Sequence, residues 1–311
     1  MDNKNIFVSI VIPVYNGEKT IGRLVEALIG RLNGFCRAEI ILVNDGSKDN
    51  SEKVCIELYR KYSGQVKFYS LAKNFSQDSA TMAGLNEAKG DFAVVMDDDL
   101  QNPVSEVLKL IDFAAQNDFD AVYTYYKEKK HTWFQNFCSK FNDLVANVML
   151  SKPKNLYLST FKIINRLVID QIIKYDGPYP YVEGLILRTT DRIGKMEALH
   201  EERTEGKSGY TIKKLFALWL NTFVNFSILP LRIFTISGFI IAIFGFLFGL
   251  WTLFERMLSP DWPAGYATVI CLVALFSGIQ LVGIGVAGEY LGRIFIFQNK
   301  KPQYVVRKRY E

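Results

Sequence analysis

Residues 8–15 read VSIVIPVY and residues 21–32 read IGRLVEALIGRL, and this pair of patterns decides the fold class. The first is a continuous apolar run, which is typical of a buried parallel strand. In the second, apolar residues recur at helical spacing along one face, and Asn16 is the predicted cap of that helix. A strand followed by an amphipathic helix is the repeating unit of an α/β sheet.

The same unit repeats as far as residue 126. Further strands are predicted at 39–43, 66–71, 92–96 and 121–126, and helices at 51–62, 77–88 and 104–116. This pattern predicts a doubly wound open sheet, in which ligands bind outside the carboxyl ends of the strands. Polar residues follow three of these strands, namely Tyr15 and Asn16, Asp45, and Asp97-Asp98-Asp99. We therefore expect the functional site at this edge of the sheet.

The charge is unevenly distributed along the chain. Residues 1–120 contain 13 Lys and Arg against 18 Asp and Glu, whereas residues 121–311 contain 24 against 14, so the net charge of +5 sums −5 and +10. An acidic half favours a cation, and a basic half favours phosphate or an anionic membrane surface. The basic residues are scattered and carry no nucleic-acid motif, so nucleic acid is not an expected partner. The four cysteines lack metal-ligand spacing and are expected to be reduced.

Two long stretches near the end of the sequence contain no charged residue. Ile233–Phe254 has 22 residues and Trp262–Gly288 has 27. A helix of 22 residues is about 33 Å long, which is enough for a hydrocarbon core of roughly 30 Å. The alternative is a pair of buried core helices, but these rarely run so far without a charge. The short linker Glu255–Asp261 predicts a transmembrane hairpin, and the basic residues after it place both termini in the cytoplasm.

Two amphipathic stretches, 133–149 and 210–229, are rich in aromatic residues and follow or contain lysines. The first fits a helix packed on the sheet or one in the membrane interface, and the second favours the interface. We therefore divide the chain into four segments. They are a cytoplasmic α/β domain at 1–209, which would carry the functional site, a juxtamembrane amphipathic region at 210–232, two transmembrane helices at 233–290 and a basic cytoplasmic tail at 291–311.

The three adjacent aspartates 97–99 would repel one another without a partner. Their hard oxygen atoms, with the amide of Gln101, suit Mg²⁺ or Mn²⁺, and such an ion would bind a diphosphate. A solvated acidic turn before the helix near Pro103 is the alternative. Asp45 by itself could likewise be only a turn and cap residue.

Four short motifs occur in a fixed order in the first third of the chain. They are Val11-Ile12-Pro13-Val14-Tyr15-Asn16, Asn44-Asp45-Gly46-Ser47, Lys73-Asn74-Phe75-Ser76 and Asp97-Asp98-Asp99-Leu100-Gln101. Together they resemble the signatures of family 2 glycosyltransferases with the GT-A fold. Arg203-x-x-Gly206-x-Ser208-x-Tyr210 and Gly288-Glu289-Tyr290-Leu291-Gly292-Arg293 narrow the resemblance to polyprenyl-phosphate glycosyltransferases. These include dolichol-phosphate mannose synthase and the bacterial undecaprenyl-phosphate glucosyl and formamidoarabinosyl transferases.

The resemblance implies an α/β fold of the GT-A type, with a Rossmann-like mixed sheet, interfacial helices and a two-helix membrane anchor. It implies inverting transfer of one sugar from a nucleotide-diphosphate sugar, by analogy a UDP-sugar, to a polyprenyl phosphate such as undecaprenyl phosphate. The reaction would occur on the cytoplasmic face of the bacterial inner membrane. The family's members are often homo-oligomers, so a tetramer is expected.

The resemblance also implies a role for each matching residue. Donor binding falls to Pro13, Tyr15, Asn16, Glu18, Asp45, Lys73, Asp97 and Asp98. Metal binding falls to Asp97, Asp99 and Gln101, and the catalytic set is Asp99, Gln101 and Arg203. The acceptor phosphate would meet Lys162, Arg203, Lys207 and Ser208. Guanidinium and ammonium groups suit phosphate oxygens, although Arg203 could instead pair with a neighbouring glutamate.

The sequence departs from the family at positions where relatives often carry an acidic residue and an arginine. This chain has Leu156 and Lys162 there, so no general base is assigned. A phosphate monoester has a second pKa of about 6, so the acceptor is largely ionised at neutral pH and can be its own nucleophile. Two alternatives stay open: a catalytically silent membrane scaffold and a processive polysaccharide synthase. The latter would need more membrane spans and a Gln-x-x-Arg-Trp motif, which the chain lacks.

Overall fold

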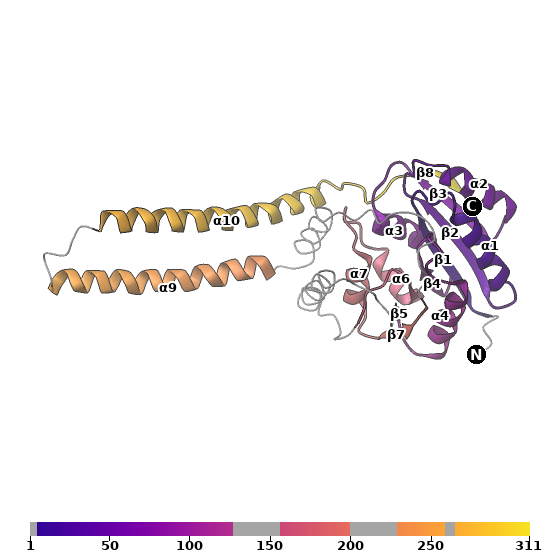
Figure 1. Cartoon of the computed structure of the whole chain (residues 1–311), viewed down its shortest axis with the longest axis horizontal. Helices are drawn as coiled ribbons and strands as arrows, with labels where there is room; N and C mark the ends of the chain where they lie inside the picture. The colour runs from indigo at the N-terminus through magenta and orange to yellow at the C-terminus, as the bar shows by residue number, and fades with distance from the viewer. Residues whose placement is uncertain (1–4, 127–155, 200–228, 259–264) are drawn as a thin grey trace. The chain divides into compact units, whose positions relative to one another are not determined.

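A computed structural model describes residues 5–126, 156–199, 229–258 and 265–311 (Figure 1). The chain divides into two compact units, one formed by 1–211 together with 300–311 and the other by 212–299. The first unit is built on a mixed sheet, and the second contains two long helices.

The described residues form one sheet with the strand order β7-β5-β6-β4-β1-β2-β3-β8. The strands are β1 (Phe7–Val14), β2 (Arg37–Asn44), β3 (Val66–Leu71), β4 (Phe92–Val95), β5 (Ala121–Tyr125), β6 (Lys162–Asn165), β7 (Ile193–Glu197) and β8 (Val306–Tyr310). Strand β1 is parallel to β2 and β4, β2 is parallel to β3, and β5 is parallel to β7. Strand β6 is antiparallel to β4 and β5, and β8 is antiparallel to β3. The α/β sheet is thus confirmed and is mixed.

Helices cover both faces of the sheet, as Figure 1 shows. One face carries α1 (Ile21–Leu32), α2 (Ser51–Lys61) and α4 (Val104–Gln116), and the other carries α3 (Gln77–Glu87), α6 (Arg166–Ile172) and α7 (Val182–Thr189). Successive residues of β1 therefore face different helices: Ile10 and Ile12 join the first core and Val11 joins the second. Burial on both faces explains why β1 is a continuous apolar run.

The prediction that Asn16 caps the first helix is wrong. The N-cap of α1 is Thr20, and its side chain makes no capping bond. Asn16 has a φ of 56°, its backbone N–H donates to Ser47 Oγ (3.0 Å), and its Oδ1 accepts from Lys48 N (2.9 Å). Asparagine tolerates this left-handed conformation, and its amide side chain fastens the loop after β1 to the loop after β2.

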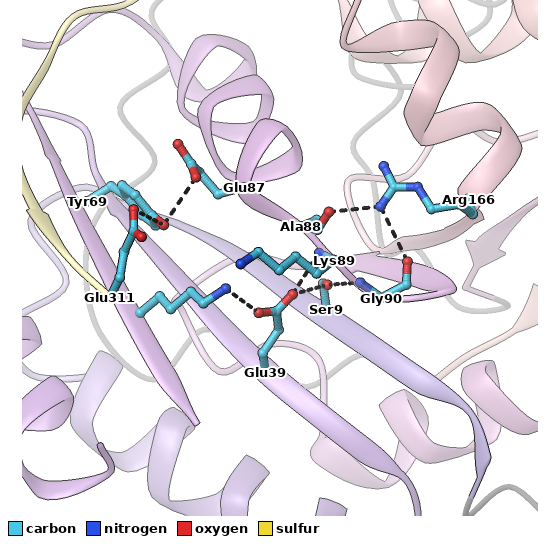
Figure 2. Close-up of polar contacts among 10 residues, drawn as sticks. Ser9, Glu39, Tyr69, Glu87, Ala88, Lys89, Gly90, Arg166 and Glu311 are labelled. Carbon is cyan, nitrogen blue, oxygen red and sulfur yellow. Dashed lines mark hydrogen bonds and ion pairs between the residues drawn. The ribbon is translucent and has the colours of Figure 1, made fainter. Parts of the chain in front are cut away.

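A buried polar network lies near the amino ends of β1 and β2 (Figure 2). Glu39 accepts bonds from Ser9 Oγ (2.6 Å) and the backbone N–H of Lys89 (2.8 Å), and it pairs with Lys67 (2.6 Å). Burial by itself would raise the pKa of Glu39, but these three bonds outweigh it and lower the pKa. The network is at the edge opposite the aspartates, so it stabilises the sheet without contributing to the predicted site.

Residues 306–310, within the segment expected to be a basic tail, form the edge strand β8. The ring of Tyr310 lies 5.7 Å from that of Phe68 and 5.5 Å from that of Tyr59. Lys308 pairs with Glu52 at 2.7 Å. Three consecutive exposed basic residues on this edge discourage pairing with another strand.

The helical unit contains α9 (Leu229–Leu258) and α10 (Tyr266–Gln298), which cover most of the two uncharged stretches. Within the described residues, one segment, Phe234–Trp251, is long and apolar enough to cross a membrane, with a mean hydropathy of 2.1. Its large side chains, among them Phe239 and Phe244, are exposed. The two-helix membrane hairpin stays a prediction.

Candidate active site

The aspartates directly follow β4 and lie beside the loop that follows β1. The backbone N–H of Tyr15 donates to Asp98 Oδ2 at 3.3 Å. A Cβ atom at Gly17 would overlap Oδ2 of the same carboxylate, so any larger residue there would displace the Asp98 side chain. The expected meeting of polar residues at the carboxyl edge of the sheet therefore occurs.

The surroundings of Asp98 disfavour the ionised form of its carboxyl group. Burial raises its pKa to about 7, the charges of Asp97 and Asp99 add to the rise, and the bond from Tyr15 N opposes it. A nearby divalent cation would offset this repulsion between carboxylates.

The described residues contain no group of three His, Cys, Asp or Glu side chains placed to bind a metal ion alone. Mg²⁺ and similar ions are usually held by one or two carboxylates plus the phosphates of a substrate, so a complete protein cage is not required. Asp97, Asp99 and Gln101 offer hard oxygen atoms within five residues and fit this kind of site. Asp99 Oδ1 also accepts the backbone N–H of Gln101 at 3.2 Å, which holds the turn that carries both.

Asp97 is bound by two side chains that the sequence analysis did not identify. Its Oδ1 accepts from Gln77 Nε2 (2.5 Å) and its Oδ2 accepts from Thr160 Oγ1 (2.7 Å). Gln77 begins α3, and Thr160 lies two residues before β6. Because β6 runs antiparallel to β4, its amino end meets the carboxyl end of β4.

Asp45 is 2% exposed and binds the loop after β3. Its two carboxylate oxygens accept the backbone N–H groups of Phe75 (2.7 Å) and Ser76 (3.1 Å). Burial raises the pKa of Asp45, and these two bonds oppose the rise. Such contacts are those of a turn residue, and a contact with the nucleotide stays a prediction.

The other predicted donor residues fall into two groups. Tyr15 is 47% exposed, and Lys73 is exposed with its ammonium 5.2 Å from the centre of the Phe75 ring. Pro13 is buried in β1, and Glu18 accepts two bonds from Asn50, at 2.9 and 3.0 Å. Tyr15 and Lys73 can therefore reach a ligand, whereas Pro13 and Glu18 support the loops around it.

Lys162 is 2% exposed, and its ammonium pairs with Glu183 Oε1 at 2.6 Å. Contact with an acceptor phosphate would require the lysine to exchange this partner. Leu156 is 5% exposed and belongs to the apolar core beside α6, so this position is part of the packing. Arg203, Lys207 and Ser208 lie outside the described residues, as do the amphipathic stretches 133–149 and most of 210–229.

Asp78, near this ion pair, should make stability depend on pH. Burial raises its pKa, as does Glu183, while Lys162 and the backbone N–H of Val182 oppose the rise. The unfolded chain then loses this proton more readily than the folded one, so stability falls as pH rises above about 4. We expect Asp78→Asn to gain stability relative to the parent as pH rises from 4 to 8, measured by urea denaturation. Exposed Asp176→Asn should show no such trend.

Ser76 is expected to be a strained cap. It caps α3 by accepting the N–H of Ser79, yet its φ of 128° and ψ of 159° fall in a region that only glycine occupies readily. Relief of about 1–3 kcal/mol of strain should exceed the loss of the cap and the added freedom of glycine. Ser76→Gly should therefore raise the free energy of unfolding by about 1 kcal/mol.

A matched change at another cap should have the opposite sign. Asn165 caps α6 by accepting the N–H of Val168 at 3.0 Å, and its φ is −82°. Asn165→Gly removes this cap, together with the bond that Asn165 Nδ2 donates to Asp120 Oδ1 (2.8 Å), without relieving strain, and should lower stability. Urea denaturation of the parent and both variants checks the prediction, and it is contradicted if Ser76→Gly is less stable than the parent.

A mixed α/β sheet with carboxylates after β4 and a polar loop after β1 is the GT-A architecture of a glycosyltransferase. The sequence profile of "Glycosyl transferase family 2" matches residues 9–173. The chain belongs to this family and is a glycosyltransferase.

Curated relatives match nearly the whole chain. The undecaprenyl-phosphate 4-deoxy-4-formamido-L-arabinose transferase of Edwardsiella ictaluri (strain 93-146) is 31% identical over 304 residues, 97% of this chain and 93% of that protein. The enzyme with the same description from Proteus mirabilis (strain HI4320) is 32% identical, with the same coverage.

Among solved structures, glucosyl-3-phosphoglycerate synthase from Mycobacterium tuberculosis, in complex with Mn²⁺ and UDP-glucose, has a TM-score of 0.53. It is 18% identical, and the alignment covers 70% of this chain and 77% of that one. This likeness confirms the GT-A fold.

Proposed function

We propose that the protein transfers one sugar from a nucleotide-diphosphate sugar, with UDP as the nucleotide, to a polyprenyl phosphate such as undecaprenyl phosphate. The supporting observation is the similarity over 97% of this chain to enzymes described as undecaprenyl-phosphate sugar transferases. Similarity over the catalytic residues alone would support only a glycosyltransferase, whereas here it includes the helices that follow the sheet.

On the donor side, the residues after β1, β3 and β4 surround the diphosphate. Asp97 and Asp99, with Gln101, hold Mg²⁺ or Mn²⁺, which when bound neutralises charge on the departing nucleoside diphosphate. The exposed Tyr15 and Lys73 face the nucleotide and its phosphates. Because both belong to loops that are hydrogen-bonded to Asp98 and Asp45, their backbone is held in place before the donor binds.

On the acceptor side, an oxygen of the lipid phosphate attacks the anomeric carbon while the bond from that carbon to the diphosphate breaks. Attack from the opposite side inverts the configuration of the sugar. No proton has to be removed, since the phosphate is largely ionised at neutral pH. The apolar burial of Leu156 is compatible with this, because the reaction needs no carboxylate there. Arg203, Lys207 and Ser208 bind the acceptor phosphate, with Arg203 supporting catalysis.

The proposal includes a membrane anchor. Residues 233–290 form two spans after a juxtamembrane region at 210–232, and residues 1–209 with the tail at 291–311 lie on the cytoplasmic side of a bacterial inner membrane. The exposed apolar segment of α9 supports the first span. An anchored enzyme keeps its site at the membrane surface, where the phosphate of a polyprenyl lipid is found. We also propose that the protein assembles as a homo-oligomer, and the family resemblance suggests a tetramer.

The test uses the full-length protein in lipid nanodiscs that contain undecaprenyl phosphate and Mn²⁺. A panel of radiolabelled nucleotide sugars is added, and lipid-extractable label is counted. We expect one donor to label the lipid, no labelling after removal of metal with EDTA, and no transfer to the soluble acceptor 3-phosphoglycerate. The proposal fails if no donor labels the lipid, or if 3-phosphoglycerate is the better acceptor.

A further inference from the structure

Two uncharged side chains hold the first aspartate of the site. Gln77 and Thr160 donate to different oxygens of the Asp97 carboxylate, at 2.5 and 2.7 Å. We propose that Gln77 and Thr160 are positioning residues that fix the orientation of this carboxylate for the metal ion and the diphosphate. This inference rests on the proposed function, because the metal ion belongs to it.

A carboxylate needs such support to present its oxygens in one direction. The terminal torsion of aspartate is broad, so the group rotates easily unless other atoms hold it. Gln77 belongs to α3, whereas Thr160 precedes β6, so the two bonds come from separate elements. Rotation of the carboxylate would lengthen both bonds together. The two donors therefore act as a clamp on Asp97.

The absence of charge on both donors is important for the chemistry. Two buried carboxylates of this sheet domain are instead bound by lysine: Glu39 pairs with Lys67 and Glu183 pairs with Lys162, each at 2.6 Å. A lysine beside Asp97 would cancel the negative charge that attracts a cation. The amide of Gln77 and the hydroxyl of Thr160 donate to the carboxylate without bringing a positive charge of their own.

Gln77 is itself held in place by the end of β2. Asp45 accepts the N–H groups of Phe75 and Ser76, the two residues immediately before Gln77. The buried carboxylate of Asp45 thus fixes the start of α3. Through this turn, Asp45 contributes to the orientation of Asp97 without contacting it.

Thr160 is held on the other side by β5. Its neighbours Ser159 and Phe161 are both buried. Thr124 Oγ1 of β5 lies 3.1 Å from Ser159 Oγ and donates to the carbonyl oxygen of Phe161 at 2.8 Å. The segment that carries Thr160 is therefore part of the rigid sheet, and a rigid support is what a positioning residue requires.

The test measures metal binding instead of turnover. The full-length protein is given UDP, GDP, CDP or ADP, and the diphosphate that the parent binds in Mn²⁺ is used throughout. Loss of a hydrogen bond to a charged group should raise the half-saturating Mn²⁺ concentration about tenfold in Thr160→Val and in Gln77→Leu. Thr160→Ser keeps the hydroxyl and should return the value to within about twofold of the parent.

Gln116→Leu is the matched control, because Gln116 Nε2 donates to Asp112 Oδ1 (2.7 Å) on the exposed surface of α4. The half-saturating Mn²⁺ concentration of Gln116→Leu should equal that of the parent. The melting temperatures of all variants, measured without metal, should also equal that of the parent. The clamp is refuted if Asp97→Ala loses Mn²⁺ dependence while Thr160→Val and Gln77→Leu keep the parent's half-saturating Mn²⁺ concentration. It is refuted equally if the only change in these two variants is a lower melting temperature. If the parent binds no diphosphate, or Asp97→Ala retains full Mn²⁺ dependence, the proposed function itself fails.

Discussion

Replacing Asp99 by asparagine should lower kcat for sugar transfer by about 10²–10³-fold. The substitution keeps the size of the side chain and its bond from Gln101 N but removes a full negative charge from the proposed metal site. Stabilisation of the departing diphosphate then decreases in the transition state, where the charge on it is greatest. Steady-state assays with undecaprenyl phosphate and the preferred donor, at saturating Mn²⁺, measure the effect.

Asp191→Asn provides the control, because Asp191 is exposed just before β7, at the edge of the sheet opposite the site. Its kcat should match that of the parent. Melting temperatures of both variants separate loss of chemistry from loss of folding. An Asp99→Asn enzyme with at least a third of the parent's kcat would contradict the role of Asp99.

Replacing Lys162 by methionine should destabilise the sheet domain by about 3–5 kcal/mol. Lys162 and Glu183 form a nearly dry ion pair, and Asp78 lies close enough for its pKa to respond to both. Removal of the lysine leaves two carboxylates in a buried region without their cation. Urea denaturation at pH 7, followed by far-UV circular dichroism, measures the loss.

Two further variants test whether the cause is the isolated charge. Lys162→Met combined with Glu183→Leu removes both charges and should recover most of the lost stability. Lys61→Met breaks a pair with Glu26 of similar length, 2.7 Å, but both side chains are more than half exposed, so little change is expected. If the double variant is as unstable as Lys162→Met, the isolated carboxylate is not the cause.

The sequence predicts the first 126 residues well because the βα repeat is a local pattern. Every strand and helix in this region is confirmed with ends that differ by at most two residues. Strands β6 and β7 are as short as β4 and β5, but they lie after the βα repeat, so no strand–helix alternation marks them, and their partners lie far away along the chain. Such short strands carry no periodicity of their own, and their pairing depends on the rest of the sheet.

The candidate site also combines residues that local sequence predicts with residues that it does not. Asp97–Asp99 could be placed because ligands bind beyond the carboxyl ends of parallel strands. Gln77 and Thr160 could not, since they are 20 and 63 residues from Asp97 in sequence and belong to no motif that specifies the contact. Lys162 did carry a signal: it lies in the apolar run Phe161-Lys162-Ile163-Ile164, where a lysine is expected to need a buried partner.

Strand β8 has a consequence for how the enzyme is made. Its residues follow the helical unit 212–299, whereas its neighbour β3 is synthesised early, and 242 residues separate Tyr69 from its partner Glu311. A ribosome therefore releases the last strand of the sheet only after both long helices. Until then β3 is an open edge that can pair with another chain. Completion of the catalytic sheet thus waits for synthesis of the helical unit 212–299, so β8 joins a sheet whose other strands are already made.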